Sequence, residues 1–173
     1  MKRRQKPIIM TATMGAGDFS WANGLRQRHY PPERNHVSAH ITLFHHLSPQ
    51  GLDEIAGMVK ETARIHPSPP SQLVDVMHLG GGVAYRLYSP ELLEIRQFFA
   101  ESFHGLLTLQ DQQKPRFHIT IQNKATDEES NALIQKLSAE FVPRPFEIVG
   151  LGLSYYLDGP WEEIGSWRFR GKV

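Results

Sequence analysis

The sequence predicts an α+β fold made of two related halves, each with an antiparallel sheet and helices. Two observations carry this prediction. The pattern His, aliphatic, Thr, aliphatic occurs at 40–43 and again at 118–121, so the second copy follows the first by 78 residues. Each half also contains a helical segment after its motif strand, and further strand-like segments. Two imperfect copies are too few for a solenoid, so two pseudo-symmetric lobes fit better.

The first half shows strand and helix patterns in alternation. Its predicted elements are a strand at 8–14, a helix at about 19–28, the first motif strand at 38–44 and a helix at 52–65. Asp18 can cap the first helix, and Pro31 stops it before the motif strand. Segment 48–51 is a predicted turn, and the proline-rich segment 67–71 is a predicted loop inside the domain.

The second half opens with a predicted hairpin. Its elements are strands at 73–79 and 83–88, a helix at 90–103, the second motif strand at 117–122, a helix at about 127–140 and strands at 146–157 and 164–169. Ser89 and Thr126 occupy positions typical of helix N-caps. The glycines at 80–82 fit the hairpin turn better than a phosphate-binding loop, because no helix follows them directly.

Each motif places two polar side chains on one face of its strand. Successive side chains of a strand point to opposite faces, so His40 lies beside Thr42, and His118 beside Thr120. The aliphatic residues between them point into a core. If the two faces meet, two imidazoles and two hydroxyls surround one small space. The alternative is a pair of ordinary core strands that carry a hydrogen-bonded His and a strand-favouring Thr.

Bulk composition excludes several classes of protein. The chain has 173 residues, 40% of them hydrophobic, and a formal net charge of +1, so its charge does not predict binding to long nucleic acids. It has no cysteine, which excludes disulfides and thiolate catalysis. The start, from Met1 to Met14, weakly imitates a signal peptide but lacks a clean cleavage site, so we expect a strand there and a cytoplasmic protein.

The doubled motif resembles that of the 2H phosphoesterase superfamily, whose mark is a pair of His-x-Thr/Ser motifs. Further segments resemble its bacterial 2′-5′ RNA ligase-like branch, over about residues 7–169. These segments are 32–35 (PERN), 107–111 (LTLQD), 116–124 (RFHITIQNK) and 159–162 (GPWE). The resemblance implies one bilobal domain over residues 1–173, with one motif per lobe at a central cleft. It also implies no cofactor, and we expect a monomer.

Two imidazoles across a cleft suit general acid–base catalysis, because histidine titrates near neutral pH. Hydroxyls beside them can hold phosphate oxygens. The resemblance implies the same roles for His40, Thr42, His118 and Thr120, without metal, on 2′,3′-cyclic phosphates or 2′-5′ phosphodiester bonds of RNA or small nucleotides. Our starting assignment makes His118 the base and His40 the acid for ring opening, although the sequence is symmetric and does not decide it.

Further residues are candidates for substrate contacts. Strand parity places Phe44 on the face of the first motif and Gln122 on that of the second, with Lys124 continuing the second series. Tyr156 and Trp161 adjoin the Gly-Pro-Trp turn and are predicted at the mouth of the cleft. Arg86, on the hairpin, is a weaker candidate. For each, the alternative is plain packing or solvation.

Other functions remain open at this point. A metal site could use His40, His45 and His46, but in one strand His45 faces away and His46 lies about 20 Å along. A protein that binds nucleotides or RNA ends without turnover would keep the same pocket. The same chemistry could also act on a non-RNA cyclic phosphate, such as a derivative of ADP-ribose.

Overall fold

The computed structural model describes residues 5–173; Met1 to Arg4, the basic part of the leader-like stretch, lie outside them. The described strands form two antiparallel four-stranded sheets, with the orders β2-β1-β7-β8 and β5-β4-β3-β6. Their bounds are β1 (Ile8–Met14), β2 (Ile41–Leu47), β3 (Gln72–His78), β4 (Val83–Tyr88), β5 (His118–Gln122), β6 (Arg144–Pro145), β7 (Ile148–Tyr156) and β8 (Trp161–Arg168). The predicted α+β class with two antiparallel sheets is confirmed.

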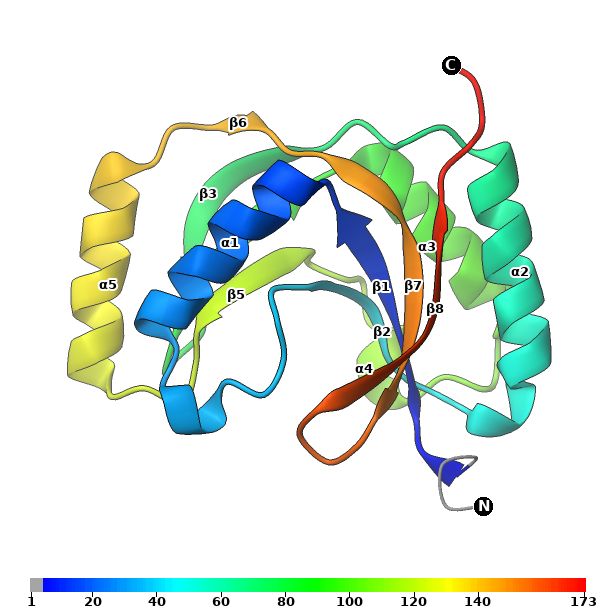
Figure 1. The fold of residues 1–173 in the computed structure, drawn as a ribbon, viewed down its shortest axis with the longest axis horizontal. Coiled ribbons are helices and arrows are strands. Elements are labelled where there is room, and N and C mark those ends of the chain that lie inside the picture. Colours follow the sequence, from blue (N-terminus) through cyan, green and yellow to red (C-terminus); the bar gives the residue numbers. More distant parts are fainter. Residues whose placement is uncertain (1–4) are drawn as a thin grey trace.

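Helices cover both sheets (Figure 1). They are α1 (Ala16–His29), α2 (Leu52–Ile65), α3 (Pro90–Ser102), α4 (Leu109–Gln112) and α5 (Asp127–Glu140), with short 3-10 turns at Pro32–Arg34 and Pro49–Gly51. Helices α1 and α5 pack on the β5-containing sheet, and α2 packs on β7 and β8 of the other sheet. The motif strands β2 and β5 are therefore left at the middle of the molecule.

The internal repeat appears as two copies of a strand–helix–strand unit. In the first copy, β1 leads through α1 to β2, and β2 pairs antiparallel with β1. In the second copy, β4 leads through α3 to β5, and β5 pairs antiparallel with β4. Each unit ends on a motif strand at the edge of its sheet. The repeat therefore places both motifs in equivalent positions.

Two of the three predicted helix caps are confirmed. The Ser89 hydroxyl accepts a hydrogen bond from the Leu92 N–H, and the Thr126 hydroxyl accepts one from the Glu129 N–H. The prediction for Asp18 is wrong, because α1 begins two residues earlier, at Ala16. The Asp18 carboxylate instead accepts from the Glu147 N–H at 2.7 Å and pairs with Arg144 at 2.8 Å.

Some elements differ from their predicted bounds. Strand β8 begins at Trp161, three residues before the prediction, because it pairs with β7 up to Tyr156. The polar loop before β5 contains the one-turn helix α4, capped by the Thr108 hydroxyl. Strand β6 includes Pro145, which lacks an N–H but lies in an edge strand, where its missing donor is tolerated.

The glycine segment at 80–82 is a hairpin turn, as predicted. Gly80 has φ of +87°, which few other residues adopt at low cost. A Cβ on Gly82 would lie 1.9 Å from the backbone oxygen of Gln122, so only glycine lets the turn approach the end of β5. The glycines of this segment therefore allow the hairpin turn to pack closely against the end of the motif strand β5.

No helix within residues 5–173 combines the length and the apolar character that a membrane crossing needs.

Candidate active site

The first motif begins immediately before β2, and its imidazole is held from the backbone. The Nδ1 atom of His40 lies 2.8 Å from the carbonyl oxygen of Ser38. A carbonyl only accepts, so Nδ1 carries the hydrogen in this contact. The Nε2 atom of a neutral His40 is then left with a free lone pair, which can accept a proton.

The second motif repeats this arrangement on β5. The Nδ1 atom of His118 lies 2.7 Å from the carbonyl oxygen of Arg116, again two residues before the histidine. Nε2 is therefore also the outward nitrogen of His118 in its neutral form. The two imidazoles thus have the same tautomer for the same reason, a backbone carbonyl at the same offset in each motif.

The two motif strands meet although they belong to different sheets. Strand β2 is the edge of one sheet, β5 is the edge of the other, and these two edges lie next to each other (Figure 1). His118 is close enough to His40 to act on its charge. This proximity supports the predicted pairing. For in-line displacement at one phosphate, we expect about 5–8 Å between the reactive nitrogens of the two histidines.

The aliphatic residues of both motifs are buried in the core, as predicted. They are Ile41, Leu43, Ile119 and Ile121. Thr42 and Thr120 are partly exposed, as are the two histidines. The core and the polar side chains therefore divide along each motif in the way that strand alternation requires.

Alternation fails one residue beyond each Thr, because both strands carry a bulge there. Leu43 is an extra residue between the pairs Thr11–Thr42 and Met10–Phe44. In β5, Ile121 is likewise an extra residue between the pairs Ala84–Thr120 and Val83–Gln122. A bulge shifts the parity of all later residues, which turns their side chains to the other face.

The bulges overturn two predicted substrate contacts. Phe44 is fully buried, 5.9 Å from Phe103 between ring centroids and 4.2 Å below the guanidinium of Arg96, so its ring has no face left for a base. Gln122 is also buried, and its Oε1 has no hydrogen-bond partner within the described part of the chain. Both side chains lie in the core. The prediction from strict strand alternation, which put them on the face of the motifs, is therefore wrong.

The remaining candidates differ in their relation to the motifs. Trp161 lies against His40, with 4.4 Å between ring centroids, and Tyr156 is its cross-strand partner. Lys124 lies beyond β5 in a left-handed turn, with φ of +58°, so strand parity does not apply to it. Arg86 pairs across the hairpin with Asp75. Among these four, Trp161 contacts the ring of a motif histidine, and Arg86 is the cross-strand partner of His118.

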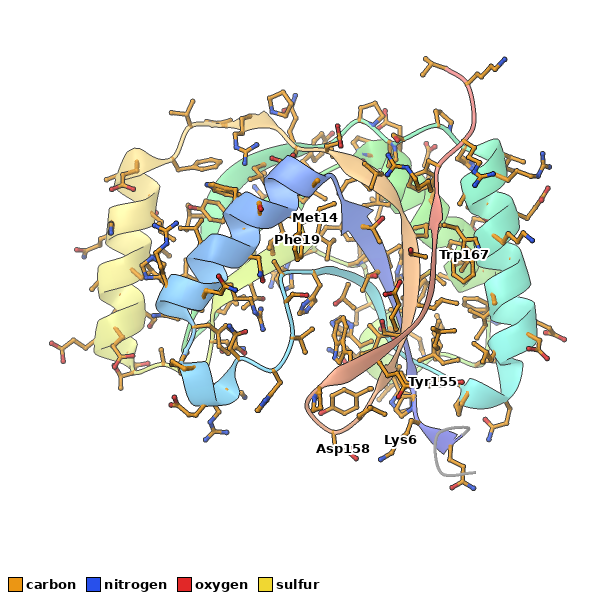
Figure 2. The ribbon with its side chains drawn as sticks, viewed as in Figure 1. Lys6, Met14, Phe19, Tyr155, Asp158 and Trp167 are labelled. Carbon is orange, nitrogen blue, oxygen red and sulfur yellow. The ribbon has the colours of Figure 1, made fainter. Side chains whose placement is uncertain are left out.

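The strand that carries Trp161 is fastened at its start. The turn before β8 has Asp158 in the left-handed region, and the Asp158 carboxylate pairs with Lys6 at 2.5 Å (Figure 2). Lys6 precedes β1, so this contact ties the turn to the first strand of the same sheet. An exposed pair of this kind stabilises by at most about 1 kcal/mol, but it reduces the freedom of the turn beside Trp161.

Arg26 is a site residue that the sequence did not reveal. It lies on α1 and is almost fully buried, with its guanidinium 4.1 Å from the Tyr30 ring centroid. Its Nη1 donates to the carbonyl oxygen of Thr120 at 3.0 Å, and its Nε donates to Asn35 Oδ1 at 2.8 Å. Asn35 belongs to the segment 32–35 that supported the family resemblance. This segment was the feature of the sequence that could have pointed to Arg26.

A second arginine contacts the other motif strand from α3. Arg96 donates from Nε to the carbonyl oxygen of Leu43 at 3.2 Å, and from Nη2 to the carbonyl oxygen of Asp111 at 2.5 Å. The buried Asp111 carboxylate accepts the backbone N–H groups of His45 and His46. Asp111 ends the segment 107–111, so this resemblance segment stabilises the edge of β2.

The environment of His40 favours its neutral form. Burial, opposed by the hydrogen bond to Ser38 and reinforced by the positive charge of Arg26 and the nearby His118, lowers the pKa of His40 to about 4. A neutral imidazole at neutral pH can accept a proton but has none to give from Nε2. This direction argues against our starting assignment of His40 as the acid.

A polar cavity of about 470 Å³ adjoins His40 on the face of the β1–β7–β8 sheet. Hydroxyl groups, Trp161 and Glu163 line it. The hydroxyl-bearing residues are Thr11, Thr13, Ser38, Ser154 and Ser166. The cavity offers hydrogen bonds and an aromatic face beside the first motif, which suit a sugar and a base better than an extended apolar ligand.

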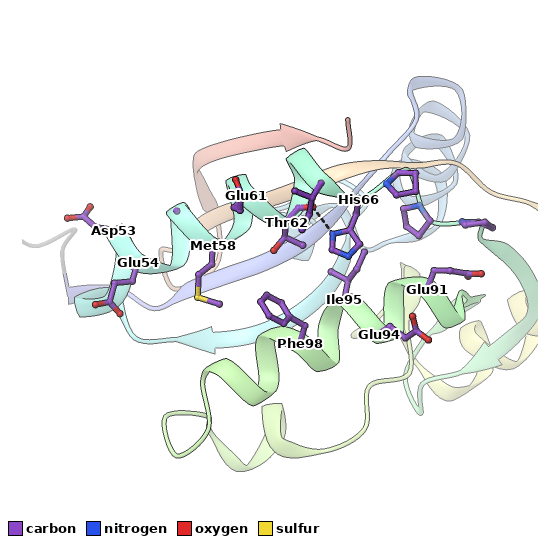
Figure 3. Close-up of a pocket in the computed structure, with 15 residues that line it drawn as sticks. Asp53, Glu54, Met58, Glu61, Thr62, His66, Glu91, Glu94, Ile95 and Phe98 are labelled. Atoms are coloured by element: carbon purple, nitrogen blue, oxygen red, sulfur yellow. Dashed lines mark hydrogen bonds between the residues drawn. The ribbon is translucent and has the colours of Figure 1, made fainter. Parts of the chain in front are cut away.

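A larger groove lies away from both motifs, between α2 and α3 (Figure 3). Its floor is apolar, with Met58, Ile95 and Phe98, and its rim carries acidic charges. The acidic residues are Asp53, Glu54, Glu61, Glu91 and Glu94. Carboxylates repel a phosphate, so this groove is a poor site for the chemistry of the motifs.

Within residues 5–173, no three His, Cys, Asp or Glu side chains gather as a metal site would require. His45 is engaged with Asp111, at 3.2 Å from Nδ1 to Oδ1, and does not join His40 around a common point.

Several solved structures share this fold. A Thermus thermophilus protein designated TT0787 superposes with a TM-score of 0.67 at 13% identity, covering 96% of this chain and 100% of that chain. A protein described as a phosphoesterase has a TM-score of 0.63 at 14% identity, over 95% and 98% of the two chains. LigT of E. coli, solved with NADP+, has a TM-score of 0.59 at 13% identity, over 95% and 98%. At sequence identities this low, the structural similarity establishes a shared fold and nothing more specific.

The family assignment comes from the sequence itself. Comparison with curated protein sequences finds no match. The sequence profile of the family described as "2'-5' RNA ligase superfamily" matches residues 17–160 of this chain. This span includes both motifs and Arg26. A match over most of the chain, together with the shared fold, confirms the predicted resemblance. The chain belongs to the 2′-5′ RNA ligase superfamily of 2H phosphoesterases.

Proposed function

We propose that this protein is a metal-independent phosphoesterase with RNA ligase-like chemistry, acting on 2′,3′-cyclic phosphates or 2′-5′ phosphodiester bonds. The observation that carries the proposal is the equivalent build of the two motifs. Each histidine is held at Nδ1 by a backbone carbonyl, His40 directly before the edge strand β2 and His118 at the start of the edge strand β5, and these two strands meet. Two such groups can serve as base and acid around one phosphate.

His40 is the base in this proposal, and His118 is the acid in its protonated form. The lowered pKa of His40 keeps it neutral at the pH of most cells, so its Nε2 can take a proton from the attacking water or hydroxyl. His118 gives its proton to the leaving oxygen. Thr42 and Thr120 donate hydrogen bonds to the non-bridging oxygens while charge develops there.

Nucleotides or RNA ends are the proposed ligands. Structures of E. coli LigT contain 3′-AMP and phosphate, so that protein binds such molecules. In this chain, Trp161 beside His40 is the proposed stacking residue for a base, and the hydroxyl-lined cavity is the proposed place for a nucleoside. Location in the cytoplasm and a monomeric state stay predictions.

The test is turnover of 2′,3′-cyclic mononucleotides and of 2′-5′ linked dinucleotides by the purified protein. We expect release of a nucleoside monophosphate from at least one of them, unchanged by excess EDTA, because both protons move through imidazoles. Loss of activity with EDTA that divalent ions restore would reject metal independence. Tight binding of nucleotides without turnover of any substrate would favour a binding protein instead.

A further inference from the structure

A small cationic pocket lies between α2 and the end of β8, outside the proposed active site. Its volume is about 230 Å³, and Lys60, Arg64, Arg168 and Arg170 contribute to its walls beside Trp167. Figure 2 shows Trp167 between β8 and α2. The whole chain has a formal net charge of only +1, so four cations around one small hollow are a strong local concentration of charge.

Three of these cations are not neutralised. Arg64 forms an ion pair with Glu61 on the same helix, at 2.5 Å. Within residues 5–173, no carboxylate lies within ion-pair distance of Lys60, Arg168 or Arg170. Side chains of like charge around one hollow repel each other, and an anion placed between them removes this repulsion.

The backbone fixes this pocket in place. The Arg170 N–H donates to the carbonyl oxygen of Ala63 at 2.9 Å, and the Gly171 N–H donates to that of His66 at 2.9 Å. Ala63 and His66 form the end of α2, so the chain after β8 is tied to the helix that supplies the other cations. The cations therefore belong to two elements held together by backbone hydrogen bonds.

Helix α2 carries cations on the side toward β8 and mostly carboxylates on the side toward α3, and Glu61 of the acidic groove pairs with Arg64 of the cationic pocket. Its Lys60 and Arg64 lie toward β8, whereas Asp53 and Glu54 belong to the acidic groove toward α3 (Figure 3). A polyanion is attracted on the β8 side of the helix and repelled on the α3 side. This contrast favours the side of α2 that faces the end of β8 for a negatively charged chain.

Strand β8 joins the cationic pocket to the proposed active site. It starts at Trp161, which lies against His40, and ends at Arg168, which lines the pocket. Seven residue steps at roughly 3.3 Å give about 23 Å between these ends. Strand β8 is also an edge strand, so no further strand of the sheet within residues 5–173 covers its outer side.

We propose that the cationic pocket is a second, distal subsite that binds backbone phosphates of a single-stranded RNA whose reacting end lies at His40. The inference rests on the proposed function for the reacting end. Trp161 at the start of β8 stacks on a base near that end, and the cations at the end of β8 neutralise phosphates several nucleotides away. A mononucleotide is too short to reach both places.

The test compares two substrates in two proteins. The triple variant Lys60→Gln, Arg168→Gln, Arg170→Gln removes the unpaired charges and keeps Trp167. We expect its kcat/KM to fall about tenfold or more on a single-stranded RNA that ends in a 2′,3′-cyclic phosphate. Its kcat/KM on a 2′,3′-cyclic mononucleotide should stay unchanged. Lys136→Gln, which removes an exposed cation from α5, is the control and should affect neither substrate.

Direct binding separates this inference from the proposed function. A 3′-phosphorylated RNA of the same sequence needs no turnover, and its affinity can be measured against salt concentration by fluorescence anisotropy. We expect the triple variant to lower the slope of log affinity against log salt by about 2, since three phosphate contacts are lost. An equal slope in variant and wild type would overturn the inference.

The remaining outcomes are also decisive. Equal losses on the RNA and on the mononucleotide would mean that the variant disturbs the active site, which overturns the inference. No loss on the RNA would overturn it as well. If the wild-type protein converts neither substrate, the proposed function fails, and the salt dependence of binding still decides whether the pocket holds RNA.

Discussion

The segment from His40 into β2 and the strand β5, which begins at His118, share three features of local structure. In each, Nδ1 of the histidine contacts the carbonyl two residues earlier, and a bulge follows the Thr. In each, a buried arginine from a helix donates to a backbone carbonyl, Arg96 to β2 and Arg26 to β5. The repeat therefore extends to the contacts that orient the imidazoles.

The two strands differ in how the arginine charge is balanced. Arg96 lies beside the carboxylate of Asp111. Burial raises the pKa of this carboxyl, but hydrogen bonds from His45 and His46 outweigh burial and hold the pKa below its usual value. Within the described part of the chain, the partners of Arg26 are neutral, namely Asn35, Tyr30 and the Thr120 carbonyl. Burial is the main cause of the lowered pKa of His40, and the uncompensated charge of Arg26 lowers this pKa further.

The largest expected effect comes from removing either imidazole. His40→Ala and His118→Ala should each lower kcat on a 2′,3′-cyclic phosphate by about 10²–10⁴, because each variant lacks one proton transfer. Circular dichroism and thermal melting should show an intact fold. Near-normal turnover by a folded His118→Ala protein would contradict the two-histidine mechanism.

The hydroxyls should matter nearly as much. Thr42→Val and Thr120→Val keep the shape and the strand preference of the side chain but remove the donor, so kcat should fall by about 10²-fold. Thr→Ser at the same positions is the matched control and should retain most of the activity. If both Val variants only melt at lower temperature and keep their kcat, the motifs are core strands.

A smaller effect should reveal the charge asymmetry. His40 is neutral above its pKa of about 4, so the acidic limb of kcat/KM in the wild-type protein should lie well below pH 6.5. Arg26→Gln removes the charge that disfavours the imidazolium, so the limb should shift to higher pH. At about pH 8, where His40 is neutral in both proteins, the rates should converge.

Arg26→Lys is the control for this prediction, because it keeps the charge and alters the hydrogen bonds. Its acidic limb should stay near that of the wild-type protein. An unshifted limb in Arg26→Gln would show that burial alone sets the protonation of His40, whereas a rate lost equally at all pH values would assign Arg26 a purely structural role.

The smallest effects on kcat are expected for the residues after the two bulges, which should alter stability and leave kcat unchanged. Phe44→Ala should destabilise the fold by about 3–5 kcal/mol, since it empties a packed core position. Gln122→Met should stabilise it by about 1 kcal/mol, because it removes a buried oxygen without a partner among the described residues. Urea unfolding measures both. A large loss of kcat in a folded Phe44→Leu protein would contradict the core assignment.

Local sequence patterns are enough to predict the class of fold, most of the elements and the four motif side chains. These follow from local rules: strand alternation places His40 beside Thr42 and Ile41 in the core, and the caps at Ser89 and Thr126 follow from their own neighbours. The same rules misplaced Phe44, because a bulge depends on how a strand pairs with its partner.

Contacts between segments that are distant in sequence become visible in the folded chain alone. Arg26 is 94 residues from Thr120 in sequence, and Arg96 is 53 residues from Leu43, so no local pattern indicates that they contact motif strands. The protonation of His40 depends on burial and on charges from another helix and another sheet. Burial and Coulomb interactions act through space, and the packing of the two sheets sets those distances.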